Sequence, residues 1–494
     1  MKKAFSILII LSLILSLFAC SGGNDDSKDT KPADTTSPVV TDPPIYYEED
    51  ELPSDLDFGG EKVFILAPEG ETWEKEISVE ELTSDPVNDS IYNREKSVED
   101  RLGVEIETEY VPADNYNNKV TIQMSSVEDT YQIYAARTVY FAQNVFDNYL
   151  TDLYNVEHID LEKPWWSPHF TEAAEVKGSL YLATGSYALS VTRLLFAVYY
   201  NKTVAENYQE TYSELGDLYT LVDSGKWTFD KLIELSSSIY KDVNGNSERD
   251  TEDTYGLLMN DGITVDPIWS SFDLNIFSRT SDGWFELDVN TDKLYSAIEK
   301  MINLLHNTTG ISVVKSAGDT SLRTMSEYFA SDSALFMVNR LLEAEHTVLR
   351  NMQSDYGILP FPKYDENQEE YYSFPHDQYL SFSIPITNQN PDIAGAVLEA
   401  MASYSYRDTV PTYLNQVLKG RYMSDAQSRN MIDLVVKGFK VDSSWIYAMT
   451  LGQFGQNFRS DMTSGSTSYA TTYAQTEKTI KIALKYTGRD FEPN

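Results

Sequence analysis

Segments with the pattern of β-strands alternate with helical segments along most of this chain. An apolar run at 62–66 is followed by a helical pattern that ends at Gly103, and then by alternating residues at 104–108. A strand, a helix and a strand at this spacing predict a βαβ unit. The order recurs at 197–200 with 228–239, and at 380–384 with 391–401. The sequence therefore predicts an α/β fold, and 494 residues are too many for one core.

The predicted helices carry ordinary end signals. Asn88 or Asp89 is the candidate N-cap of the first helix, and Gly103 suits the left-handed position that ends it. Thr228 is the candidate cap of the helix at 228–239, with Trp227 placed before it as part of a hydrophobic staple. We therefore interpret Trp227 as structural.

Cys20 is the only cysteine, and it closes the run Leu17-Phe18-Ala19-Cys20. Two lysines and an apolar run of about 15 residues precede it, which is typical of a secretory signal and too short to span a bilayer. We predict a signal peptide at 1–19. The arrangement resembles the lipobox of bacterial lipoproteins, which implies a diacylglycerol and acyl chain such as palmitate on Cys20 and a firm membrane anchor. The alternative is an ordinary signal peptide with a chance cysteine.

Composition excludes several classes of function. The formal charge of −39 argues against nucleic-acid binding, which depends on Lys and Arg neutralising phosphates. An acylated Cys20 would leave no thiol for disulfides, cysteine-ligated zinc or thiol catalysis. Residues 20–56 are rich in Asp, Thr, Ser and Pro, a composition that cannot bury a core. We therefore predict that the lipidated Cys20 is followed by a disordered acidic tether to residue 56.

Searches for catalytic motifs find none. The sequence lacks H-E-x-x-H, G-x-S-x-G, G-x-G-x-x-G and the phosphate loop, and its five histidines show no ligand spacing. Acidic residues are so abundant that the carboxylate pair of a glycosidase would not stand out among them. The prediction is that the chain is not an enzyme, and a surface glycoside hydrolase stays as the alternative.

One polar loop has the spacing of a calcium site. Calcium prefers several oxygen ligands from a tight loop, with side chains at alternate positions. Ser247 stands at the sixth position, where an EF-hand has glycine, and Asp replaces Glu at the twelfth. A simple polar turn is the alternative. The candidate ligands of a structural calcium ion are Asp242, Asn244, Asn246, Glu248, Asp250 and Asp253. The similar run at 288–292 leads directly into a helical pattern and is predicted to cap it instead.

Aromatic side chains are the second candidate for binding chemistry. Ring faces hold the apolar face of a sugar, and Asp, Asn and Arg bind its hydroxyls. Trp165 and Trp166 lie in a proline-bounded loop with no helical face to fill, so ligand contact and lobe packing are both open. Trp269 and Trp445 each follow an aspartate that could serve a hydroxyl, and both are candidate ligand contacts.

The order of several short blocks resembles a known family. The blocks lie at 90–99, 163–166, 180–187, 198–202, 225–228, 253–256 and 356–362. Together they are similar to the extracellular solute-binding lipoproteins of ABC importers, in the sugar-binding group that includes maltose-binding protein. The resemblance runs from about residue 62 onward. It implies a two-lobed periplasmic-binding-protein-like fold, with hinge crossovers and a ligand cleft between the lobes.

The resemblance also implies boundaries, partners and further site residues. Lobe 1 is expected at 57–190 plus 358–402, and lobe 2 at 191–357 plus 403–494. The expected partners are a small-molecule ligand such as an oligosaccharide, the transmembrane subunits of an ABC permease, and the membrane through the acyl anchor. The chain is expected to be a monomer on the extracellular or periplasmic face. By position in the family's blocks, the ligand residues would include Tyr187, Asp266, Trp269, Asn339, Arg340, Asp377 and Tyr379.

Two alternatives stay open at this point. A glycan-capture adhesin would share the tether and the aromatic site without taking part in transport. A cationic solute would also suit aromatic rings with carboxylates, through cation–π contacts.

Overall fold

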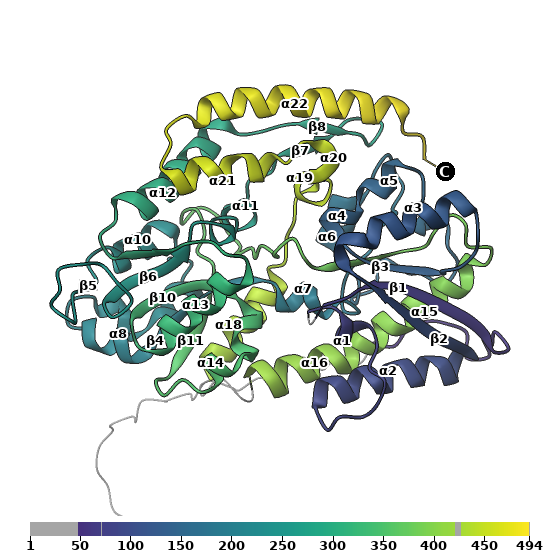
Figure 1. Ribbon diagram of the computed structural model, residues 1–494, viewed down its shortest axis with the longest axis horizontal. Coiled ribbons are helices and arrows are strands. Elements are labelled where there is room, and N and C mark those ends of the chain that lie inside the picture. The colour runs from purple at the N-terminus through teal and green to yellow at the C-terminus, as the bar shows by residue number, and fades with distance from the viewer. Residues whose placement is uncertain (1–47, 71, 420–425, 494) are drawn as a thin grey trace, which may run out of the picture. The chain divides into compact units, whose positions relative to one another are not determined.

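The computed structural model describes residues 48–493 apart from 71 and 420–425, and these residues lie in one compact unit. Cys20, the predicted signal peptide and most of the predicted tether therefore lie outside the described residues. Among the residues described, no helix is both long and apolar enough to cross a membrane. Two main sheets and one hairpin organise the chain (Figure 1).

The first sheet has four strands in the order β12-β3-β1-β2. β1 (Glu61–Pro68) pairs in parallel with β2 (Val104–Val111) along its whole length and with β3 (Ile133–Arg137), and β12 (Leu380–Ser383) runs antiparallel to β3. α2 (Pro86–Leu102) connects β1 to β2, so the predicted βαβ unit is confirmed. We call this sheet with its helices lobe 1.

The second sheet has six strands, and we call it with its helices lobe 2. Its path is β11 (Tyr356–Pro360), β4 (Phe196–Asn201), β10 (Ala334–Arg340), β6 (Thr254–Asn260) and β5 (Tyr240–Lys241), with β9 (Ile311–Val314) beside β6. β4 and β10 are buried along their whole length. A separate hairpin joins β7 (Phe277–Arg279) to β8 (Phe285–Leu287).

Helices cover both sheets (Figure 1). In the part of the chain up to β4 they are α1 (Glu74–Ile77), α3 (Tyr116–Ser126), α4 (Thr138–Phe141), α5 (Gln143–Phe146), α6 (Pro168–Ala174) and α7 (Leu189–Arg193). Between β4 and β12 they are α8 (Lys202–Tyr208), α9 (Leu218–Asp223), α10 (Phe229–Ser237), α11 (Ile268–Ser271), α12 (Thr291–Asn307), α13 (Asp319–Ala330) and α14 (Thr347–Arg350). After β12 they are α15 (Pro391–Tyr404), α16 (Val410–Thr412), α18 (Ala426–Lys437), α19 (Ser443–Ile446), α20 (Ala448–Leu451), α21 (Phe454–Ser464) and α22 (Tyr469–Asp490).

Local signals explain the helix ends, with one correction. Thr228 caps α10 by accepting the N–H of Lys231, and Asn290 caps α12, as the two sequence patterns predict. The predicted cap of α2 at Asn88 or Asp89 is wrong. Asp85 is the N-cap of α2, and its side chain accepts hydrogen bonds from two backbone N–H groups. Proline follows at the first helical position, where its missing N–H costs no hydrogen bond.

The folded part begins earlier than the predicted end of the tether at residue 56. Asp50 is 9% exposed, and its carboxylate accepts two hydrogen bonds from Arg101 on α2, at 2.6 and 2.7 Å. Its backbone N–H donates to Ser403 on α15 at 3.1 Å, and Leu52 is buried with it. Asp50 and Leu52 therefore pack on lobe 1, because the ion pair with Arg101 compensates the buried charge of Asp50.

Two predicted lobe boundaries also shift. Residues 358–360 belong to β11, which pairs with β4, so they lie in lobe 2 rather than at the start of the second segment of lobe 1. Residues 403–419 do not begin lobe 2. The helical segments η6 (Ser405–Thr409) and η7 (Tyr413–Lys419) follow α15 and pack against α2 of lobe 1. η7 also contacts η5 (Leu341–Glu345) of lobe 2, and α18 then packs on β11.

Candidate functional site

Polar side chains meet where strands of both sheets end. β3 ends at Arg137 and β10 at Arg340, and Asp266 follows a short helix after β6. His376 and Asp377 precede β12, whose first residue pairs with Arg137. The carboxyl ends of strands are where open α/β sheets bind ligands. We call the interacting groups the polar cluster: Arg137, Asp266, Asp319, Arg340, Glu343, His376, Asp377 and Arg459.

A buried ion pair holds one side of the polar cluster. Asp266 is 2% exposed, and Arg459 on α21 donates to both of its carboxylate oxygens, with Nε at 3.0 Å from Oδ1. Burial raises the pKa of Asp266 to about 6, although Arg459 lowers it and Asp377 adds to the rise. Because both oxygens already accept bonds, Asp266 positions Arg459 and offers no free oxygen for acid–base work.

A second network runs from lobe 2 to the segment before β12. Arg340 donates to Glu343 at 2.8 Å and to Asp319 at 2.9 Å, and its Nη1 lies 3.3 Å from Nδ1 of His376. Burial, with Arg340 and Arg459 nearby, lowers the pKa of His376 well below its usual value, so the ring is neutral. Nδ1 must then accept from Arg340, and Nε2 lies 3.3 Å from Oδ1 of Asp377.

The arginines of the polar cluster lie near carboxylates of the protein. The pKa of the Asp377 carboxyl is raised by burial and lowered in turn by Arg459 and Arg137. Arg137 lies 3.7 Å from the exposed Asp114. Each arginine of the polar cluster therefore has a carboxylate near it, and an anionic ligand would find no unpaired arginine among these residues.

An aromatic wall lies beside the polar cluster in lobe 2. Trp269 and Trp445 are both 2% exposed, and their ring centroids are 6.4 Å apart. Phe454 and Phe458 pack against Trp269, and Phe374 packs against Trp445. Within the described part of the chain, neither indole Nε1 has a hydrogen-bond acceptor. Two buried N–H donors without partners are costly, which points to a polar ligand that accepts from them.

Several site residues escape the sequence analysis, among them Trp73, Arg137 and Arg459. Trp73 donates its indole N–H to the carbonyl of Gln378 at 2.7 Å, and the guanidinium of Arg137 lies 5.3 Å from the Trp73 ring centroid. Arg137 also lies over Tyr140, at 4.6 Å. A signal for Arg137 exists, because it ends a buried apolar strand. Arg459 carries no such signal, since it meets Asp266 across 193 positions.

Three aromatic candidates lie elsewhere in the fold. Trp165 and Trp166 are buried in lobe 1, where Trp165 packs on Tyr406 and Trp166 donates to Glu399 at 2.9 Å. Tyr187 is stacked on Phe382 at 4.2 Å. These three residues therefore lie inside lobe 1, apart from the polar cluster, and their role as ligand contacts stays a prediction.

Two further candidates also fill the interior. Asn339 is fully buried in lobe 2 and donates to the carbonyl of Leu322 at 3.1 Å. Tyr379 packs between the rings of Phe170 and Phe439. Of the ten predicted ligand residues, five come together at the polar cluster and the aromatic wall: Asp266, Trp269, Arg340, Asp377 and Trp445.

Glu399 gives a stability prediction with a defined sign. Burial raises its pKa from 4.5 to about 7. The folded chain holds this proton more tightly, so the stabilisation is full below pH 4.5 and is lost as the pH rises through 7. Glu399→Gln keeps an acceptor for Trp166 and removes the charge. At pH 8 we expect the variant to be more stable by up to about 3 kcal/mol, with no gain at pH 4.5. Thermal unfolding at the two pH values measures this, and an equal shift at both would contradict it.

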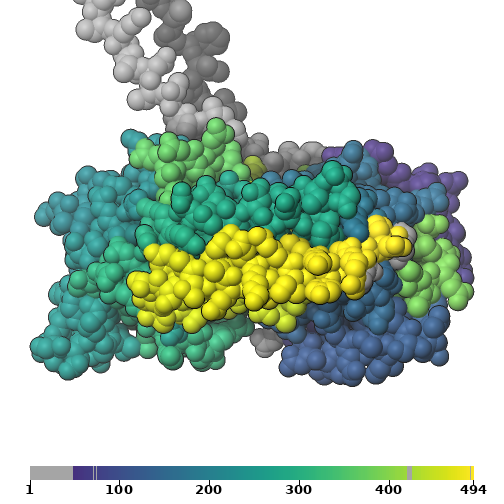
Figure 2. Space-filling view, turned by 90° about the horizontal axis from the view of Figure 1, so that it is seen from above, coloured from purple at the N-terminus to yellow at the C-terminus, as the bar shows by residue number. Residues whose placement is uncertain are grey.

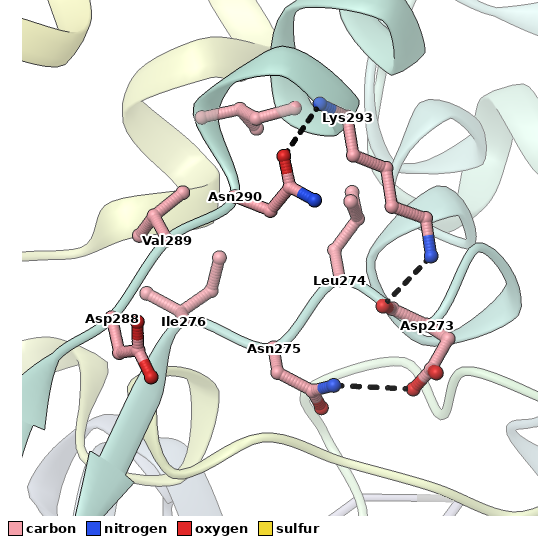
Figure 3. Close-up of a pocket in the computed structure, with 9 residues that line it drawn as sticks. Asp273, Leu274, Asn275, Ile276, Asp288, Val289, Asn290 and Lys293 are labelled. Atoms are coloured by element: carbon pink, nitrogen blue, oxygen red, sulfur yellow. Dashed lines mark hydrogen bonds between the residues drawn. The ribbon is translucent and has the colours of Figure 1, made fainter.

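A surface pocket in lobe 2 lies apart from these groups (Figure 3). It has a volume of about 340 Å³ and is lined by 273–276, 288–290, Lys293 and Leu294. Lys293 donates to the carbonyl of Asp273 at 3.2 Å, and Asn275 donates to the Asp273 carboxylate. None of its lining residues belongs to the polar cluster or the aromatic wall.

The loop at 242–253 is a turn held by hydrogen bonds among its own polar groups. Ser247 has φ of 64°, the left-handed conformation for which an EF-hand uses glycine at this position. Asp242 accepts the N–H groups of Gly245 and Ser247, and Asn246 donates to Asp250 at 2.7 Å. Asp253 is buried and accepts backbone N–H groups. In the described residues, no group of three His, Cys, Asp or Glu side chains is arranged to hold a metal ion.

Solved structures with the same architecture are receptors and binding proteins. The GacH receptor of Streptomyces glaucescens, determined unliganded and with acarbose, matches with a TM-score of 0.54 at 14% identity, covering 86% of this chain and 99% of the receptor. The cyclic alpha-maltosyl-1,6-maltose binding protein of Arthrobacter globiformis matches with a TM-score of 0.56 at 13% identity, covering 87% and 100%. A cyclo/maltodextrin-binding protein complexed with maltotetraose matches at 0.55 and 12%, covering 86% and 97%.

This chain has the two-lobed periplasmic-binding-protein fold. The predicted fold class is thus confirmed. No protein-family model and no curated protein sequence matches the chain. The periplasmic-binding-protein fold places the polar cluster between the carboxyl ends of the strands in the two lobes, with contributions from both.

Proposed function

We propose that this chain is an extracellular receptor that captures a neutral oligosaccharide at the polar cluster and delivers it to an ABC permease. The observation that carries the proposal is that the arginines of the polar cluster are already paired with carboxylates, while Nε1 of Trp269 and Nε1 of Trp445 have no acceptor among the described residues. The hydroxyl oxygens of a sugar can accept hydrogen bonds from these N–H groups, and they bring no charge into the site. The solved structures with this fold include complexes with acarbose and with maltotetraose, which supports the same ligand class.

A cationic ligand suits the site less well. The rings of Trp269 and Trp445 already contact Phe454, Phe458 and Phe374, so they form no open aromatic cage. A hydrolase is also less favoured, because both oxygens of Asp266 are engaged by Arg459. The function is therefore binding, in which the lobes part to admit the ligand and close on it.

A thermal-unfolding screen tests this proposal. The panel contains neutral glucan, mannan and xylan oligosaccharides, their uronate counterparts, and quaternary amines. We expect neutral oligosaccharides alone to raise the unfolding temperature. If only the uronates or only the amines stabilise the chain, the proposal of a neutral oligosaccharide ligand is wrong.

Chromatography of the ligand after incubation separates a receptor from an enzyme. We expect the oligosaccharide to be recovered intact, and its cleavage would favour the surface hydrolase. Uptake by cells that lack the gene separates a transport receptor from an adhesin. We expect uptake to fall, whereas unchanged uptake with retained glycan binding would favour the adhesin.

The membrane anchor is part of the proposal. Cys20 lies outside the described residues, and its place after a signal-like segment supports acylation there. Cys20→Ser is expected to move the protein from the membrane fraction to the medium or periplasm, because no acyl chain can then form. Fractionation of cells measures this, and an unchanged membrane fraction would contradict it.

We also propose that the loop at 242–253 holds a structural calcium ion. Ion binding to the folded state alone stabilises it by about 3 kcal/mol at a hundredfold excess over Kd. Chelation is therefore expected to lower the unfolding temperature without abolishing ligand binding. Asp242→Ala should remove this response, and Asp288→Ala, in the similar run that caps α12, should keep it. If no chelator changes the unfolding temperature, the proposal of a structural calcium ion is contradicted.

A further inference from the structure

An aromatic seam joins the two lobes away from the polar cluster. Phe146 and Tyr181 come from lobe 1, and four rings come from segments that follow the crossover to lobe 2. The Phe146 centroid lies 5.1 Å from that of Tyr447, 5.7 Å from Phe491 and 6.0 Å from Trp284. Tyr181 lies 6.0 Å from Phe491. The members of this seam are Phe146, Tyr181, Trp284, Phe285, Tyr447 and Phe491.

α22 connects the seam to the distant side of lobe 2. Figure 2 shows α22 in yellow, lying on the surface between segments of both lobes. Its first residue, Tyr469, packs on Tyr295 of α12 and donates a hydrogen bond to Glu299. Just after its last residue, Phe491 is 1% exposed and packs against lobe 1. One helix of 22 residues therefore has one end fixed to each lobe.

Polar contacts strengthen the lobe 1 end of α22. Lys177 of lobe 1 donates to the carbonyls of Gly488 and Phe491, at 3.1 and 2.8 Å. A cation suits the carboxyl end of a helix, where carbonyls lack partners within the helix. The backbone N–H of Lys177 also donates to Gly283 in the β7–β8 hairpin, and Arg279 of β7 donates to the carbonyls of Glu172 and Ala173.

One short helix links the seam to the aromatic wall. α19 carries Trp445, which belongs to the wall, and Tyr447 of the seam follows its last residue. Ser443 donates to the carbonyl of Ala173 at 2.7 Å, and Tyr447 donates to that of Ala174, both in α6 of lobe 1. A displacement of the seam would therefore displace Trp445.

We propose that the seam and the lobe 1 end of α22 form a latch that favours the lobe arrangement in which the polar cluster is assembled. The latch contacts and the polar cluster occur together in one arrangement. Any arrangement that separates Phe491 from Phe146 and Tyr181 loses these contacts, so they bias the equilibrium between arrangements. The latch thereby sets the ligand affinity from outside the site. This inference rests on the proposed function for its effect on affinity, but not for its effect on the lobes.

Two variants of α22 test the latch with a matched control. Phe491→Ala removes the contact with lobe 1, and Tyr469→Ala removes an aromatic ring from the same helix where it touches lobe 2 only. We expect Phe491→Ala to weaken the binding of the oligosaccharide that stabilises the chain most in the screen by about tenfold. Tyr469→Ala should leave that affinity unchanged. Equal affinities of wild type and Phe491→Ala, or equal losses in both variants, would overturn the latch.

Small-angle scattering of the unliganded chain tests the same idea without a ligand. We expect the radius of gyration of Phe491→Ala to exceed that of wild type and of Tyr469→Ala. An unchanged radius would overturn the latch, whereas the absence of any sugar binding would overturn the proposed function alone. Lys177→Met is a milder variant, for use if Phe491→Ala does not fold. It should show the same increase in radius and about threefold weaker binding, and a radius equal to that of wild type would count against the latch.

Discussion

Arg459→Ala is expected to abolish ligand binding and to lower the free energy of unfolding by about 3 kcal/mol. The change leaves the carboxylate of Asp266 buried, with both oxygens deprived of their donor. Removing one partner of a buried ion pair lowers the free energy of unfolding by much more than the intact pair contributes to it. Denaturant unfolding near pH 8 and calorimetric titration with the oligosaccharide measure the two effects.

The loss in Arg459→Ala should depend on pH. Burial already raises the pKa of Asp266 to about 6, and removal of Arg459 takes away the charge that lowers it. The folded variant then holds the proton still more tightly, so the destabilisation is smaller near pH 5 than near pH 8. The double variant Asp266→Asn with Arg459→Met should recover stability and stay unable to bind. Equal destabilisation at both pH values would contradict a buried, unpaired carboxylate.

Trp269→Phe is expected to weaken binding by about tenfold while changing stability little. The substitution keeps an aromatic ring among Trp445, Phe454 and Phe458 but removes an indole N–H that has no acceptor in the described part of the chain. The loss of this N–H group is therefore expected to affect ligand binding and not the stability of the fold. Calorimetric titration measures the affinity, and denaturant unfolding checks the fold.

Trp227→Phe is the matched control for Trp269→Phe. Trp227 is equally buried in lobe 2, but its Nε1 donates to the carbonyl of Pro360 at 2.8 Å. We expect this control to lose stability, because a buried carbonyl loses its partner, and to bind the ligand as wild type does. Full affinity in Trp269→Phe would remove that residue from the site.

Local structure could be predicted because its signals lie close together in the sequence. The strand of β1, the capping of α10 by Thr228 and the left-handed Gly103 each depend on a few neighbouring residues. The choice between ligand contact and lobe packing for Trp165 and Trp166 could not be made from the sequence, for a physical reason. A proline-bounded loop shows no helical face, yet here it is folded into lobe 1, where Glu399 accepts the N–H of Trp166.

The site itself could be predicted only in part. Asp266, Arg340 and Asp377 are predicted from their places in short blocks that resemble the solute-binding family, and the structure brings them together. Arg459 lies on a polar helix, and its role depends on a contact with Asp266 that no local pattern encodes. Trp73 is likewise placed by its bond to Gln378, more than three hundred positions away.

Hydrogen exchange with and without the bound oligosaccharide tests the central claim most directly. Segments that carry the polar cluster and the aromatic wall come from both lobes: 137–140 and 374–379 beside lobe 1, and 266–269, 443–446 and 456–460 in lobe 2. We predict that the ligand slows exchange in both sets together, and leaves the loop at 242–253 unchanged. Protection confined to one lobe, or located at the pocket of Figure 3, would contradict capture between the lobes.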